Sequence, residues 1–174
     1  MIKFTNVVLM IMVFSIHANA EDRQKALILP KIPLSYAFAA AHGAIKAEVD
    51  PEKITLEMQG KKPVWKFNYG INGTLRQVLV DGVSGRVIKK IRLQEKSAPL
   101  RRIRKLPSTV DDTDKVLAAA KALRGDDGPA LGLSLVSEQK ILFWLVDFES
   151  GEVKLDGETL KLSEAGTSEV EEGL

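Results

Sequence analysis

Two apolar periodicities follow one another in the first half of the chain. Apolar side chains recur at spacings of three and four over residues 34–47, which predicts a helix with one buried face. Pro51 prevents that helix from continuing. Apolar and polar residues then alternate in two runs over residues 54–69, which predicts strands. Asn72-Gly73 favours a type I′ hairpin turn, so residues 34–93 are predicted as one helix and about four antiparallel strands.

The second half repeats this order in a shorter form. Helical spacing predicts a helix over residues 113–123, and the aspartates of residues 111–114 suit its N-terminal cap and first turn. Alternating leucines over residues 131–135 predict a strand, whereas residues 141–146 are apolar at every position. A strand without alternation requires cover on both faces. The helix covers one face of this strand. The other face is expected to pack against the first half, in preference to the N-terminal lead-in or a partner.

One phrase occurs in both halves. Residues 79–87 match residues 145–153 at six of nine positions. The alanine-rich segments upstream match at an offset of 79 residues but the phrases at 66, so the second copy is 13 residues shorter, about one strand and a loop. An Asp that opens a loop hydrogen-bonds the backbone two residues on, and a glycine then takes the left-handed conformation. We therefore predict four structural turn residues: Asp81, Gly85, Asp147 and Gly151.

The N-terminus resembles a secretory signal. Residues 1–20 combine Lys3, an apolar run and an A-x-A motif, which predicts cleavage after Ala20 and a periplasmic or secreted product; the alternative is an uncleaved membrane anchor. The later residues contain no apolar run of membrane-spanning length, so no membrane span is predicted. The chain has no cysteine, so its stability depends on an apolar core.

Charge divides the chain. Residues 21–110 hold 18 Lys and Arg against 8 Asp and Glu, whereas residues 111–174 hold 6 against 15. The two halves attract each other or have simply diverged; alternatively, the basic half meets an acidic partner or an anionic surface. Residues 94–110, which contain two prolines and a basic run, are predicted as a linker, and residues 163–174 as an acidic disordered tail. The candidate partner or anion contacts are Lys89, Lys90, Arg92, Arg101, Arg102, Arg104 and Lys105.

The first half resembles a PepSY domain over about residues 34–90. The resemblance rests on Gly-Lys-x-Pro-Val-Trp at residues 60–65, followed by Val-Asp-x-x-x-Gly-x-Val at residues 80–87. Residues 111–162 resemble a degenerate second copy. The resemblance implies an α+β fold of two PepSY-like units in tandem, each with one helix packed on a small antiparallel β-sheet. The predicted division is a lead-in at residues 21–33, then units at 34–93 and 111–162 joined by the basic linker.

The composition offers little for catalysis. His42 is the only histidine beyond the predicted signal, so the usual zinc sites and nucleophile–histidine pairs lack residues. The aspartate clusters lack the distal glutamate of a calcium loop. The aromatic row of Trp65, Phe67 and Tyr69 is interpreted as core beneath the helix. We expect no catalytic, cofactor or metal site, and no enzyme activity.

These patterns predict an exported, non-enzymatic binding protein. The PepSY resemblance implies that it inhibits or modulates a peptidase, or binds peptide or another envelope partner; nucleic acid is not expected. Strand addition at a free sheet edge would provide the contact, and the strand missing from the second unit is expected to expose that edge. The alternative is a binding module for an anionic envelope component that uses the basic region of residues 86–105.

Overall fold

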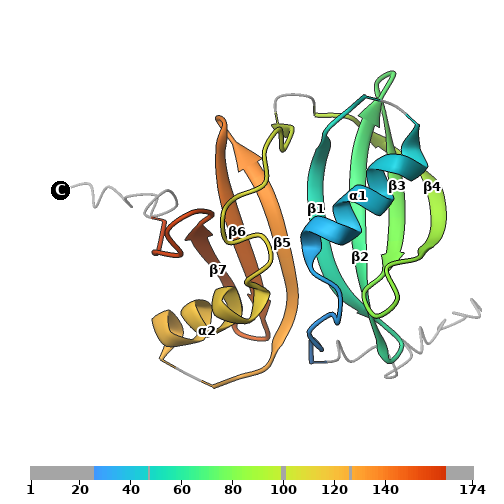
Figure 1. The fold of residues 1–174 in the computed structure, drawn as a ribbon. Coiled ribbons are helices and arrows are strands. Elements are labelled where there is room, and N and C mark those ends of the chain that lie inside the picture. Colours follow the sequence, from blue (N-terminus) through green and yellow to red (C-terminus); the bar gives the residue numbers. More distant parts are fainter. Residues whose placement is uncertain (1–25, 47, 99–100, 126, 164–174) are drawn as a thin grey trace, which may run out of the picture.

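The computed structural model describes residues 26–46, 48–98, 101–125 and 127–163. The predicted signal and residues 164–174 of the predicted tail lie outside these ranges. The described residues form two helices and seven strands (Figure 1). In chain order these are α1 (Leu34–Ile45), β1 (Pro51–Gln59), β2 (Lys62–Ile71), β3 (Thr74–Asp81), β4 (Val87–Lys96), α2 (Thr113–Arg124), β5 (Ala130–Glu138), β6 (Ile141–Phe148) and β7 (Gly151–Asp156).

All seven strands belong to one antiparallel sheet in the order β4-β3-β2-β1-β5-β6-β7 (Figure 1). The prediction of two units, each with its own small sheet, is therefore wrong. β1 pairs with β2 on one side and with β5 on the other. At this seam Ile54 lies opposite Leu135 and Leu56 opposite Leu133. The two halves are joined by backbone hydrogen bonds as well as by packing.

The missing strand explains the continuous sheet. The repeated phrase lies at the β3–β4 connection in the first half and at the β6–β7 connection in the second. β5, β6 and β7 thus correspond to β2, β3 and β4, and the second half has no counterpart of β1. An unpaired central strand would leave backbone donors and acceptors unsatisfied. β1 of the first half supplies the missing pairing for β5.

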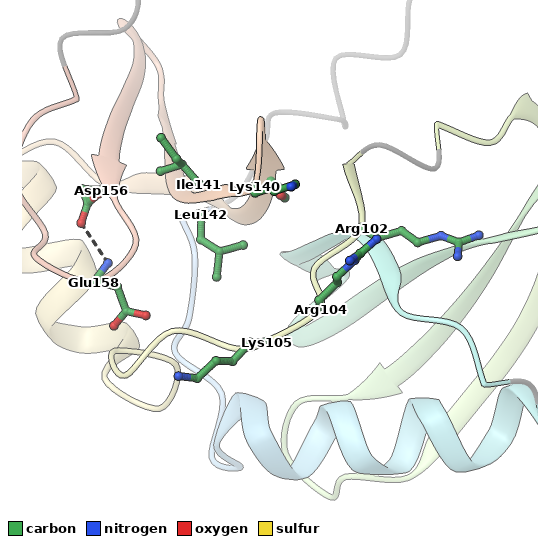
Figure 2. A pocket seen from close by; sticks show the side chains of 9 residues that line it. Arg102, Arg104, Lys105, Lys140, Ile141, Leu142, Asp156 and Glu158 are labelled. Carbon is green, nitrogen blue, oxygen red and sulfur yellow. Dashed lines mark hydrogen bonds between the residues drawn. The ribbon is translucent and has the colours of Figure 1, made fainter.

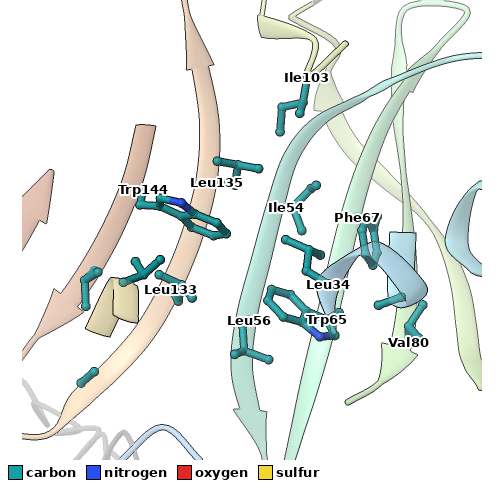
Figure 3. Close-up of a cluster of buried hydrophobic side chains, with 14 of the residues drawn as sticks. Leu34, Ile54, Leu56, Trp65, Phe67, Val80, Ile103, Leu133, Leu135 and Trp144 are labelled. Atoms are coloured by element: carbon teal, nitrogen blue, oxygen red, sulfur yellow. The ribbon is translucent and has the colours of Figure 1, made fainter. Parts of the chain in front are cut away.

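Both helices lie on one face of the sheet, and one apolar core runs beneath them across the seam (Figure 3). Trp65 and Trp144 are fully buried in it, one in each half. The segment after β4, predicted as a linker, contributes to this core, because Ile103 is 1% exposed and its N–H donates to the Pro51 carbonyl at 2.7 Å. Hence the segment has no regular structure around Ile103 but is packed rather than freely solvated.

β6 is covered differently from the prediction. Trp144 and Val146 are buried on the helix side. Phe143 points to the opposite face and is 6% exposed, because Lys154 of β7 places its Nζ 4.2 Å from the ring centroid. Phe143 is therefore covered by the neighbouring strand of its own half, and not by the first half as predicted.

The free sheet edge also lies elsewhere. β7 is followed by a segment that folds back along it, with the Ser163 N–H donating to the Lys154 carbonyl and Leu162 bridging to Leu155. β5 is paired with β1. β4 is the end strand of the first half, and no described residue pairs with its outer edge. The prediction that the second unit exposes the edge is corrected accordingly.

Within the described ranges, neither helix is both long enough and apolar enough to cross a membrane.

Candidate functional site

β4 is a ten-residue edge strand that is exposed along nearly its whole length. Cations outnumber carboxylates along it, with Lys89, Lys90, Arg92 and Lys96 against Glu95. Within the described part of the chain, none of these cations has its nitrogen within 4 Å of a carboxylate oxygen. The strand combines free backbone hydrogen-bonding groups with unneutralised positive charge.

The register of β3 and β4 increases this charge on the helix side. Lys90 lies opposite Val78, and Arg92 lies directly opposite Arg76. Like charges in direct cross-strand positions are destabilising, by about 0.2–1 kcal/mol for a typical pair. An anion between Arg76 and Arg92 would remove this repulsion.

A shallow pocket of about 360 Å³ lies between this part of β4 and the end of α1. Its cations are Lys46, Arg76, Lys90 and Arg92, and no carboxylate lines it. Lys90 donates from Nζ to the Ala44 carbonyl at 3.2 Å, where the C-terminal end of a helix favours a cation. Ile45 and Ile91 add apolar surface. We define these four cations together with Lys89 and Lys96 as the β4 basic edge.

Sequence reasoning missed Lys46 and Arg76. Neither belongs to a charge run, and the pairing of Arg76 with Arg92 depends on strand register. That register shifts between Leu79 and Val80, next to the β3–β4 turn, so counting from the turn does not locate the pair. Alternation along residues 74–81 would have placed Arg76 on the helix side, but not beside β4.

The predicted basic surface of residues 86–105 is divided in the structure. Lys89, Lys90 and Arg92 lie on β4, whereas Arg102, Arg104 and Lys105 line a separate pocket in the second half. Arg101 lines a third pocket, which contains the carboxylates of Glu52, Glu95 and Glu138. The seven candidate contacts therefore do not form one continuous site.

The four predicted turn residues behave differently in the two halves. Asp81 accepts hydrogen bonds at Oδ1 from the N–H groups of Val83 and Ser84, both at 2.8 Å, and these bonds lower the pKa of its carboxyl. Gly85 has a φ of +73°, and a Cβ there would overlap the Tyr36 ring. These residues fit the predicted turn chemistry.

Asp147 requires a correction. It lies in β6 opposite Glu152 rather than in the turn, which consists of the two residues between Phe148 and Gly151. Gly151 has a φ of +132° beside this tighter turn. Desolvation raises the pKa of Glu152, and the Asp147 charge raises it further. The shared letters of the phrase therefore do not produce the same local structure.

The remaining candidates for chemistry lie in the core or beside it. Trp65, Phe67 and Tyr69 are fully buried, which confirms the core interpretation. Burial raises the pKa of the Tyr69 hydroxyl, and the Asp50 charge adds to the effect. His42 stacks on Phe38, with ring centroids 5.9 Å apart. The described residues contain no group of three metal-binding side chains, and the expectation of no enzyme activity stays a prediction.

Comparisons with known proteins add a fold likeness. No family model matches the chain, and no curated protein matches it. The crystal structure of a "putative lipoprotein" from Clostridium difficile 630 is similar, with a TM-score of 0.57 and 15% identity over 80% of this chain and 97% of that chain. At this identity the likeness shows the fold alone, and the PepSY resemblance stays a prediction.

Proposed function

We propose that the protein is an exported, non-enzymatic binding protein that takes an acidic, extended peptide segment as an added strand along β4. The observation that carries the proposal is the β4 basic edge, where an unpaired strand and unneutralised cations coincide. An added strand gains affinity from main-chain hydrogen bonds and specificity from alternate side chains. Acidic side chains on that strand would pair with the cations.

Export is supported by the predicted signal over residues 1–20 and by the name of the structurally similar protein, a "putative lipoprotein". The PepSY resemblance supports a peptide as the partner and suggests that the peptide belongs to a peptidase.

Lysines on an edge strand often serve to prevent unwanted pairing. Here they discriminate between partners by charge. A second copy's β4 would bring cations against cations, whereas an acidic strand neutralises them. The repulsion between Arg76 and Arg92 is relieved in the same complex. The edge therefore favours an acidic peptide over self-association.

Fluorescence anisotropy with a labelled ten-residue peptide of alternating Glu and Val tests the proposal. We expect binding that weakens as salt rises, and none for a peptide of alternating Lys and Val. Arg92→Gln lowers affinity, whereas Arg86→Gln, at an exposed position before β4, leaves it unchanged. Equal binding of both peptides would contradict the proposal.

Proline substitutions separate strand addition from simple charge attraction. Adjacent residues of an edge strand direct their N–H groups to opposite sides. Of Ile91→Pro and Arg92→Pro, one therefore loses a bond to β3 and the other a donor on the free side. The variant that keeps its melting temperature is the one that has lost a donor on the free side, and its affinity for the acidic peptide should fall below that of a control with the same charge. That control is the wild type if the variant is Ile91→Pro, and Arg92→Gln if the variant is Arg92→Pro. If the affinity of that variant equals that of its control, the peptide binds by charge attraction and not by strand addition.

A further inference from the structure

A pocket of about 490 Å³ lies in the second half, between the segment after β4 and the β5–β6 hairpin (Figure 2). Ile141 and Leu142 of β6 give it an apolar wall, and Ile141 is 52% exposed. The charged residues that line it are Arg102, Arg104, Lys105, Lys140, Asp156 and Glu158. Four cations thus face two carboxylates around a partly apolar space.

Both carboxylates are already engaged. Asp156 accepts at Oδ1 from the N–H groups of Glu158 and Thr159, at 3.1 and 2.8 Å. Glu158 accepts at Oε2 from the N–H and the hydroxyl of Ser108, at 2.9 and 2.6 Å. These bonds lower the pKa of both carboxyls, so both are ionised at neutral pH. Neither lies within 4 Å of a pocket cation, and an excess of two positive charges remains.

Lys140 is held at this pocket by an unfavourable turn. Gln139 and Lys140 have φ values of +50° and +72°, which L-residues with long side chains rarely adopt. The equivalent positions of the β2–β3 hairpin are Asn72 and Gly73, the residues that this turn prefers. The β5–β6 hairpin therefore places a lysine beside the pocket where glycine would be more stable.

Arg102 occupies the rim. Its Nε is buried and has no hydrogen-bond acceptor among the described residues. Figure 2 shows its guanidinium pointing away from Lys105 and Glu158. Arg102 therefore contributes its charge from the rim, and the pocket as a whole keeps its excess of two positive charges.

We propose that this pocket binds a phosphate monoester that carries an apolar substituent. A phosphate dianion offsets the two excess charges, and a guanidinium such as that of Arg104 contacts two phosphate oxygens at once. Lys105 and Lys140 act as point charges, and the substituent packs on Ile141 and Leu142. The pocket's volume lies within the range of about 300–1,000 Å³ that is typical of small-molecule sites.

Isothermal titration of the protein with phenyl phosphate tests the proposal. We expect binding of phenyl phosphate that depends on Lys140, weaker binding of inorganic phosphate and none of benzyl alcohol. Lys140→Gly should weaken phenyl phosphate binding by about tenfold and raise the melting temperature, because glycine suits the turn. Lys61→Gln, which removes an exposed lysine from the β1–β2 turn, is the matched control and should bind normally. No binding of phenyl phosphate, or equal binding by Lys140→Gly, would overturn the proposal.

Vesicles distinguish the source of the ester. Co-sedimentation with phosphatidylcholine vesicles that contain phosphatidic acid, reversed by phenyl phosphate, identifies a lipid headgroup. Phenyl phosphate binding without co-sedimentation identifies a soluble ester. Binding to pure phosphatidylcholine that Lys140→Gly does not change would count against the pocket. Because the β4 basic edge shares no residue with this pocket, its variants should leave the Lys140-dependent part of phenyl phosphate binding unchanged.

Discussion

The two halves of the sheet differ in their number of strands and in which of their edge strands are paired. The first half has four strands of its own, and its outer strand β4 is left without a partner in the described chain. The second half has three strands, pairs its inner edge with β1 and pairs part of β7 with the segment at residues 160–163. Because the second half has no counterpart of β1, its strands join the sheet of the first half through β1, and β4 is left as the free edge.

This comparison predicts that the halves differ in autonomy. A fragment of residues 26–98 should fold, because its four strands keep their pairings with one another and α1 still covers them, although β1 loses β5. A fragment of residues 101–163 should not, because β5 loses its backbone hydrogen bonds to β1, and Leu133 and Leu135 lose their neighbours across the seam. Circular dichroism and urea denaturation of the two fragments measure this. Cooperative unfolding of the second fragment alone would refute the dependence on β1.

The two buried tryptophans predict the next largest difference. Trp144 donates from Nε1 to the Thr109 hydroxyl at 3.0 Å, whereas the indole nitrogen of Trp65 has no acceptor in the described chain. Both side chains are 0% exposed, so replacement by Phe removes similar apolar contacts. Trp144→Phe should therefore cost about 1 kcal/mol more unfolding free energy than Trp65→Phe. Urea denaturation gives both values, and a Thr109→Val background should abolish the difference.

The turns of the β2–β3 and β5–β6 hairpins predict opposite changes in stability when a glycine is removed from the first and introduced into the second. Gly73→Ala places a Cβ at a φ of +75° and should cost about 1 kcal/mol. Gln139→Gly relieves a non-glycine residue at +50° and should gain up to about 1 kcal/mol. Thermal denaturation compares them. A loss of stability in Gln139→Gly would show that its side chain makes a compensating contact.

The smallest effects concern pH. Hydrogen bonds lower the pKa of Asp81 below 3.8 in the folded state, so its stabilisation is present above that value and is lost as pH falls through the folded pKa. Desolvation raises the pKa of Glu152 above 4.5, so its ionisation destabilises the fold as pH rises through the folded value. Asp81→Asn should lower the melting temperature at neutral pH.

Glu152→Gln should raise that temperature at neutral pH, and its difference from wild type should fade below pH 4.5. Melting curves over a pH series measure both variants. The same sign of change for the two variants at neutral pH would contradict the contrast.

Local patterns predicted local structure well. Alternation identified Trp65 and Phe67 as core, and the turn chemistry of Asn72-Gly73 and of Asp81 follows from residues that are close in sequence. The offsets between the two copies also predicted the missing strand. Each of these features depends on side chains within a few residues of one another, so the sequence displays them directly.

The candidate sites were only partly predictable. Lys90 and Arg92 were visible as a basic run, but Arg76 reaches them only through strand register. Arg102, Arg104 and Lys105 were visible too, but Lys140 joins them from a hairpin 35 residues beyond Lys105. Asp147 shares its phrase with Asp81 and yet lies within a strand, because the second turn is tighter.

The sequence by itself determined the helices and most strands, because periodicity and turn chemistry are local. Only the tertiary structure decided which strand edges meet. Every strand offers the same backbone donors and acceptors, so its side chains do not specify which other strand its edge will pair with. The pairing of β1 with β5 thus emerged from the packing of the two halves into one core. That pairing also decided that the free edge is β4, where six cations of the first half form the β4 basic edge.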